Sequence, residues 1–326
     1  MAPTEAMALA ISQHLDPDPT TPRQSDGGRV VLAITPTRGG RQALEWAVVH
    51  ALRACRTLVL VHSVRDEIEV LCRLEPASRE AIIKDCEDRG ARLLEDAALL
   101  ARTSGLTGVR RVLSSLDTDS ALVSESHGAA LLVLGDDGRR AAPGPALAAA
   151  RRLHDAGVRC PVAEVGDNVW QRRGARHVLA VIDGTCRSGA ILDAAFEEAR
   201  LHERELTVLV APDPTSPEWD LVQAGFERQV ARVMIDQRRR SSNDLAISVV
   251  LEQTSIDRHL ACAGSLSDVV VVEDHHVEYL LATVFSDPDN SRNLVTIVLP
   301  RDDTVEREAV KAASHAALDD DGSWRF

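Results

Sequence analysis

The sequence has few aromatic residues, no paired cysteines and no long apolar run. Aromatics make up only 3% of the chain, so its cores must be built from Leu, Val, Ile and Ala. The six cysteines are scattered without a Cys-x-x-Cys pair, which indicates neither a zinc site nor a disulfide framework and favours reduced thiols. There is no stretch of about 18 apolar residues and no basic start to the N-terminus, so we expect neither a membrane-spanning helix nor a secretory signal. Together these absences predict a cytoplasmic protein.

The chain also lacks an excess of positive charge, with 37 Lys and Arg residues against 50 Asp and Glu residues. Its formal net charge is −13 at pH 7, and a polyanion such as nucleic acid or an anionic membrane surface would be repelled by it. The length of 326 residues suits two domains of ordinary size. We therefore expect no nucleic-acid partner and no membrane partner.

The stretch from Arg176 to Ala211 repeats an earlier one. Each copy has an apolar run, a turn, an amphipathic helix pattern and a second apolar run, which is typical of a strand–turn–helix–strand unit in a parallel sheet. The offset is constant, because positions 30 and 178 differ by 148, and so do 44 and 192, 47 and 195, and 58 and 206. The matching residues are Val30/Val178, Leu44/Leu192, Ala47/Ala195 and Leu58/Leu206.

Later matches continue the repeat with a shorter offset. Positions 131 and 269, and 134 and 272, differ by 138, so the second copy has lost about ten residues after its second strand. The sequence predicts two tandem doubly wound parallel-sheet α/β domains of Rossmann-like type, each with strand order 3-2-1-4-5. The predicted divisions are a disordered arm at 1–28, a first domain at 29–166, a linker at 167–175, a second domain at 176–300 and an acidic tail at 301–326.

Apolar runs predict the later strands, and the spacing of apolar residues predicts helices over Ser78–Ser104 and Pro217–Arg239. The fifth strands are expected at Cys160–Val165 and Val295–Leu299, with Pro161 typical of a strand at a sheet edge. In a sheet of this order, ligands bind outside the carboxyl ends of the first and fourth strands. The turns that matter are those after Ile34 and Ile182, and those after Leu134 and Val272.

Several motifs at these turns resemble one family. They are Val181-Ile-Asp183-Gly184-Thr185, Ala43-Leu-x-Trp46-Ala47, Gly135-x-x-Gly138 and Cys160-Pro-Val. On these residues the chain resembles tandem universal stress proteins of the actinobacterial kind, over residues 29–165 and 176–300. The resemblance implies that the fifth strands of the halves meet and form a pseudo-dimer within the chain. Whether the whole chain is a monomer or a homodimer stays open.

The ATP-binding branch of that family implies a nucleotide site built from Thr35, Gly135, Gly138, Asp183 and Gly184. An Asp follows the first strand there, and Gly-x-x-Gly with a later Gly-Ser or Gly-Thr presents backbone amides to phosphates. The first copy has Gly135 and Gly138 but Thr35 in place of the Asp, and Asp136 and Asp137 lie between the glycines. These departures predict eroded nucleotide binding, with ATP as the only candidate cofactor.

The second copy departs from the ATP-binding pattern in the opposite way. It keeps Asp183, but Glu273 and His276 replace the glycines of the fourth-strand turn. Asp183 has two interpretations, a hydrogen bond to a ligand amine or a cap on the following helix. The loop Glu273-Asp274-His275-His276 has an unassigned role, as a metal-binding or a polar loop, and we expect no metal site.

The sequence shows no catalytic arrangement. There is no Gly-x-Ser-x-Gly turn and no Cys–His pairing that spacing supports. We therefore predict a non-catalytic stress-response or regulatory protein with an unknown protein partner. The alternatives are an ATP- or AMP-binding sensor that uses the first domain, and a protein-interaction scaffold.

Overall fold

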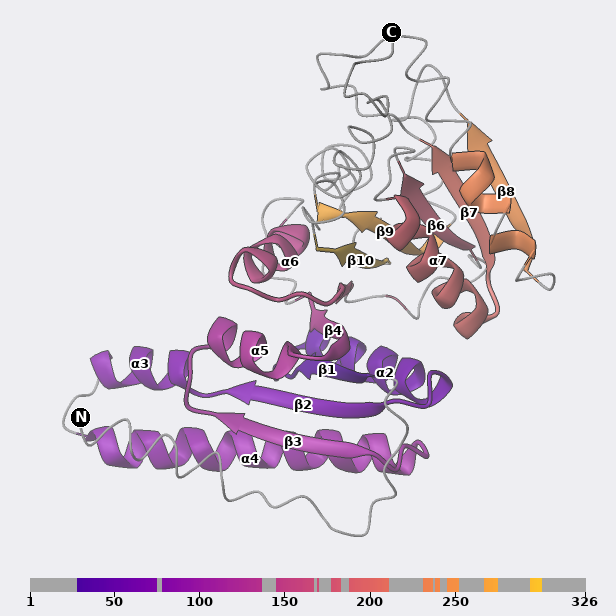
Figure 1. Cartoon of the computed structure of the whole chain (residues 1–326). Coiled ribbons are helices and arrows are strands. Elements are labelled where there is room, and N and C mark those ends of the chain that lie inside the picture. Colours follow the sequence, from indigo (N-terminus) through magenta and orange to yellow (C-terminus); the bar gives the residue numbers. More distant parts are fainter. Residues whose placement is uncertain are drawn as a thin grey trace, which may run out of the picture.

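The computed structural model describes most of the first half and the central sheet of the second. The described residues are 28–74, 78–136, 145–166, 169, 177–182, 188–210, 231–236, 238–240, 245–251, 267–274 and 294–300. They form one ten-stranded sheet with the order β3-β2-β1-β4-β5-β10-β9-β6-β7-β8 (Figure 1). Each half therefore has the predicted strand order 3-2-1-4-5, and the mostly parallel α/β fold is confirmed.

The first half alternates strands with helices. Its strands are β1 (Arg29–Ala33), β2 (Thr57–Ser63), β3 (Val109–Ser114), β4 (Ala129–Gly135) and β5 (Val162–Val165). Its helices are α2 (Arg38–Arg53), α3 (Arg65–Leu74), α4 (Arg79–Thr103), α5 (Thr118–Ser126) and α6 (Pro145–Asp155). None of the helices among the described residues is long and apolar enough to cross a membrane.

The second half repeats the arrangement. Its strands are β6 (His177–Ile182), β7 (Glu205–Val210), β8 (Ile247–Leu251), β9 (Ser267–Glu273) and β10 (Val295–Leu299). The first helix is α7 (Ser188–His202). Residues 231–236 and 238–240 are also helical and end one residue beyond the helix predicted over Pro217–Arg239.

The strand pairing shows the internal repeat directly. Val30 of β1 pairs with Leu131 of β4, and Val178 of β6 pairs with Val269 of β9. A register shift precedes each pair, between Arg29 and Val30 and at the corresponding place in β6. The repeat inferred from the two sequence offsets is thus a repeat of pairing register.

The two halves are joined through their fifth strands. β5 and β10 pair antiparallel, with Ala163 opposite Ile297, and Gly166 N–H donates to the Leu294 carbonyl at 3.0 Å. β5 begins at Val162, two residues later than predicted. The preceding Pro161 lies outside the ladder, and its carbonyl accepts from Leu132 N–H at 3.0 Å. The sheet is continuous, so neither fifth strand is an edge.

Helices cover both faces of the sheet. Successive strand residues point to opposite faces, so Val30 and Leu32 join one core and Val31 joins the other. The first core packs against α2, α4 and α7, and the second against α5 and α6 (Figure 1). The helices pack with small side chains, which replace the missing aromatics: Ala43, Ala47, Ala98 and Ala195 on one face, and Ala121 and Ala150 on the other.

Candidate functional site

In the first half, the turn after β1 lies in backbone contact with the end of β4. A Cβ built on Gly39 would overlap the carbonyl oxygen of Asp136. A Cβ on Gly135 would lie 2.5 Å from the Gly39 carbonyl oxygen and 2.7 Å from the Gly40 nitrogen. Glycine is required at both positions because only a residue without a side chain permits this approach. The start of α2 therefore occupies the place between the ends of β1 and β4.

Two backbone donors at this place are engaged within the fold. Thr37 caps α2, and its hydroxyl accepts from Gly40 N–H at 3.0 Å. Asp136 N–H donates to the Val165 carbonyl at 2.9 Å. The hydroxyls of Thr35 and Thr37 lie 2.8 Å apart in a hydrogen bond. Thr35 thus supports the helix cap from the position where the resemblance implies an Asp.

The other predicted site residues are placed only in part. Gly138, Asp183 and Gly184 lie outside the described residues, as do His275 and His276. Consequently the structure brings Thr35 and Gly135 to the same end of the sheet and leaves the rest of the predicted nucleotide site undescribed.

The corresponding place in the second half carries side chains. Glu273 is the last residue of β9, as Gly135 is of β4, and it is buried. The next residue, Asp274, is also buried, and its carboxylate lies 3.8 Å from Nδ1 of His154 in α6 of the first half. The beginning of the predicted polar loop therefore faces the other half of the chain instead of open solvent.

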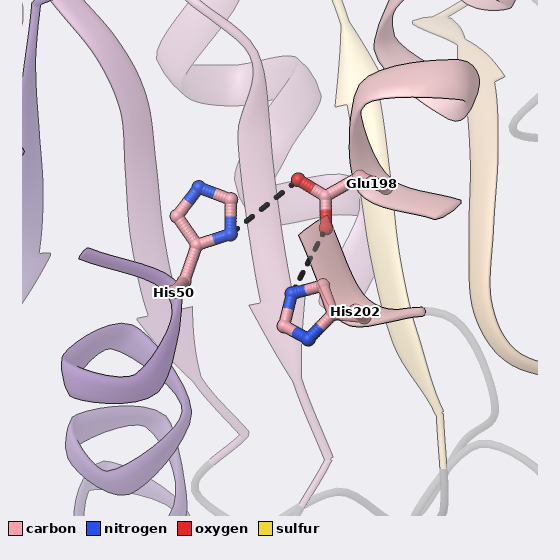
Figure 2. Close-up of side chains that lie close together, drawn as sticks. All are labelled: His50, Glu198 and His202. Carbon is pink, nitrogen blue, oxygen red and sulfur yellow. Dashed lines mark ion pairs between the residues drawn. The ribbon is translucent and has the colours of Figure 1, made fainter. Parts of the chain in front are cut away.

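A second cluster of titratable side chains lies between α2 and α7. Nδ1 of His50 lies 3.4 Å from one carboxylate oxygen of Glu198, and Nε2 of His202 lies 3.4 Å from the other (Figure 2). One ligand atom from each of the three residues lies within 4.8 Å of the other two. Among the described residues this is the group that brings three such side chains together.

The cluster is buried and poorly hydrogen-bonded. His50 is 1% exposed and Glu198 5%. Both ring nitrogens of His50, Oε2 of Glu198 and Nε2 of His202 lack a hydrogen-bond partner among the described residues. Burial lowers the pKa of His50 to about 4, with the nearby Glu198 acting in the opposite direction, so the imidazole is neutral at pH 7.

Aromatic and basic side chains surround the cluster. Trp46 is buried and stacks on the rings of His50 and His202, with centroids 5.0 and 6.0 Å away. Arg53 donates to Nδ1 of His202 at 3.2 Å and to the Leu201 carbonyl at 3.3 Å. Trp46 therefore packs against both histidine rings, and the cation of Arg53 lies beside His202.

Sequence reasoning missed this cluster, although a signal was present. Positions 50 and 198 differ by 148, the offset that relates the two copies, so His50 and Glu198 are equivalent residues of equivalent helices. Arg53 and Leu201, which touch, are separated by the same 148 residues. In a two-fold interface, a residue near the axis meets its own counterpart. The pairing of α2 with α7 thus repeats the geometry of a symmetric dimer within one chain.

Comparisons with known proteins identify the fold of this chain. No family model and no curated protein matches the sequence. Solved structures do match. A universal stress protein from Archaeoglobus fulgidus superposes with a TM-score of 0.57 and 11% identity, over 85% of this chain and 98% of that one.

Two proteins from Pseudomonas aeruginosa are also similar. One, from strain UCBPP-PA14 and described as a putative universal stress protein, gives a TM-score of 0.53 and 17% identity over 88% of this chain and 99% of that one. The other, of unknown function and from strain PAO1, gives 0.52 and 17% over 89% and 98%. The chain therefore has the Rossmann-like fold of universal stress proteins, in tandem and within a single sheet.

Proposed function

We propose that this protein is a non-catalytic stress-response or regulatory protein of the tandem universal stress protein type, in which nucleotide binding has been lost. It acts in the cytoplasm, through contacts with a protein partner. The observation that carries the proposal is the backbone contact between Gly39 and the end of β4, at the place where ligands of this fold class bind.

Phosphate recognition in such folds depends on unpaired backbone amides at a helix start. Here the amide of Gly40 is bonded to its own helix cap, and that of Asp136 to the neighbouring strand. In the sequence, Asp136 and Asp137 put two negative charges between the glycines of the motif that would hold phosphates. A like charge at about 4 Å costs roughly 1–4 kcal/mol, or about one to three decades of affinity.

The second half supports the same proposal by a different route. Its fourth strand ends in the buried Glu273, so a carboxylate takes the position at which the first half has a glycine. Backbone approach of a phosphate to that position is then hindered both by a side chain and by its charge.

Calorimetric titration of the purified chain with Mg-ATP and with AMP tests the proposal, together with mass spectrometry for co-purified nucleotide. We expect no heat of binding, no shift in the melting temperature and no bound nucleotide. A single micromolar site would overturn the proposal and favour the ATP- or AMP-binding sensor.

Two variants assign any binding that is found. Thr35→Val removes the hydroxyl of the first half, and Asp183→Ala removes the carboxylate that the second copy retains. Loss in one variant alone would locate the site in that half. Retention in both would place it away from the two sheet crevices.

A further inference from the structure

We propose that His50, Glu198 and His202 form a divalent-metal site that connects the two halves of the chain, and that the metal is Zn²⁺. His50 comes from α2 of the first half, and Glu198 and His202 come from α7 of the second (Figure 2). The site does not involve the sheet crevices discussed above, so the test of metal binding is independent of the test of nucleotide binding.

The spacing of the ligand atoms fits a small tetrahedral ion. Zn²⁺ binds histidine nitrogen and carboxylate oxygen at about 2.0–2.2 Å, which places ligand atoms about 3.3 Å apart in a tetrahedron. One carboxylate oxygen of Glu198 lies 3.4 Å from Nδ1 of His50, and the other lies 3.4 Å from Nε2 of His202. All three residues have an atom within 4.8 Å of the others, so a small closure of His50 on His202 completes the ligand set.

All three ligands lie on helices. Glu198 and His202 are four residues apart on α7, and side chains at this spacing lie on one helix face. His50 lies in the last turn of α2, where Trp46 stacks on its ring one turn earlier. No loop has to rearrange to bring the three side chains together.

The buried polar atoms provide the second line of support. Buried side-chain nitrogens and oxygens in folded proteins almost always have a partner. Four such atoms in this cluster lack one among the described residues, and three of them belong to the two histidines. A bound cation would satisfy the atoms that face the centre of the cluster.

The ligand types select the metal. Two imidazoles and one carboxylate suit Zn²⁺, whereas Mg²⁺ and Ca²⁺ prefer all-oxygen sites. Three protein ligands leave a fourth position for water, toward the partly exposed His202. The expected role of the metal is to hold α2 against α7, because His50 belongs to α2 and Glu198 and His202 belong to α7.

Arg53 opposes metal binding. It donates to Nδ1 of His202, so the ring proton is on Nε2, which is the atom that would bind the metal. Metal binding requires the other tautomer, in which Nδ1 carries the proton and Arg53 withdraws. The guanidinium also places a positive charge beside the site. Removing Arg53 should therefore strengthen binding.

The test is a competition titration of Zn²⁺ alone against a chromogenic chelator, with the full-length chain freed of metal beforehand. We expect one Zn²⁺ per chain with a dissociation constant of micromolar or below. Glu198→Gln and His202→Gln should each weaken binding by more than the roughly 10–100-fold that loss of an outer partner costs. Arg53→Gln should tighten it by about five-fold.

The control variant is His177→Gln. Nδ1 of His177 lies 3.5 Å from the carboxylate of Glu205 and is not part of the cluster, so this substitution should leave the Zn²⁺ affinity unchanged. Position is read independently with Co²⁺, which should quench the fluorescence of Trp46. Trp46→Phe should retain binding and lose most of the quenching.

Three results would overturn the proposal. They are no stoichiometric Zn²⁺ binding by the wild-type chain, binding that survives unchanged in both Glu198→Gln and His202→Gln, or quenching that persists in Trp46→Phe. Misfolding of Glu198→Gln or His202→Gln would also abolish binding, so these two variants do not decide the outcome alone. Arg53→Gln complements them, because Arg53 is exposed and its substitution is expected to strengthen Zn²⁺ binding.

Discussion

In the first half the fourth strand ends in Gly135, and in the second half the equivalent strand ends in Glu273. Around Gly135 the chain packs backbone against backbone, with the start of α2 in contact with Asp136. Around Glu273 the same position carries a long side chain, and that side chain is buried. Strand order and register are the same in both halves, so the difference lies in what fills the end of the sheet.

The comparison shows that the same sheet topology is compatible with backbone packed at its central crevice in one half and with a buried side chain there in the other. The glycine arrangement depends on the absence of side chains at Gly39, Gly40 and Gly135. The second half has Ser188 where the first has Gly40, since positions 40 and 188 differ by 148, and Ser188 is fully buried. The two halves should therefore respond differently when these residues are exchanged.

The largest expected effect comes from giving the first half the residue of the second. A Cβ on Gly40 would overlap the carbonyl and the hydroxyl of Thr35, so Gly40→Ser should lower the free energy of unfolding by about 1–3 kcal/mol. The reverse exchange, Ser188→Gly, should cost only about 1 kcal/mol, mainly through backbone entropy. Urea denaturation monitored by circular dichroism gives both values.

Gly189→Ala provides the matched control for that exchange. Gly189 lies in the first turn of α7, and a Cβ there would meet only the flexible ends of Met234 and Arg238, at 3.3 and 3.5 Å. It should be neutral or stabilising, by up to about 1 kcal/mol. Equal losses for Gly40→Ser and Ser188→Gly would show that the two crevices are packed alike, against the comparison above.

A smaller effect is expected at the cap of α5. The carboxylate of Asp117 accepts from Ser120 N–H at 2.9 Å, and this backbone hydrogen bond lowers its pKa. Asp117→Ala should lower the free energy of unfolding by about 0.5–2 kcal/mol at pH 7. Because the pKa of Asp117 is lower in the folded than in the unfolded state, its ionised carboxylate stabilises the fold fully above the unfolded-state pKa. This stabilisation is lost as the pH falls through the folded-state pKa, so the difference from wild type should shrink below about pH 4.

Asp117→Ala also tests how far the halves act together. They share one sheet through β5 and β10, so we expect the whole transition to move without splitting. Two separate steps would show that each half unfolds by itself. Asp119→Ala is the control, because its exposed pairing with Arg152 should contribute less, about 0.2–1 kcal/mol.

The smallest effect concerns cysteine reactivity at the junction of the halves. Burial raises the pKa of Cys160 to about 11, whereas Cys55 is exposed on the surface of the first half. At pH 8 only about one Cys160 thiol in a thousand is ionised, so alkylation should modify Cys55 before Cys160. Peptide mass spectrometry after brief iodoacetamide treatment measures the order. Faster labelling of Cys160 would show that the sheet opens near β5.

Much of the fold could be predicted from the sequence because its signals are local or periodic. The apolar runs that became β1 and β6 are buried on both faces, and Leu131 and Val269 took up equivalent pairings, as their offset indicated. Helix α4 was predicted within one residue at each end, because Gly105 directly follows its C-cap residue, Ser104. The start of β5 was placed two residues early because periodicity locates an element better than its ends.

The candidate site was less accessible to sequence reasoning. Motif positions located Gly135 and Thr35, but the contact of Gly39 with Asp136 joins residues far apart in the chain and has no local pattern. The His50–Glu198–His202 cluster has the same origin. It requires the 148-residue repeat and a two-fold arrangement of α2 against α7 at once.

By itself the sequence determined the repeat, the two doubly wound halves and their strand order, because hydrophobic periodicity and short connections leave few other topologies. The family resemblance implied that the fifth strands meet, and only the tertiary structure decided how the two halves pack together. Antiparallel pairing of β5 with β10 continues one sheet across both halves, and α2 lies against α7. The physical reason is that contacts between equivalent residues depend on how the two folded halves pack against each other, and the hydrophobic periodicity of the sequence does not specify that packing.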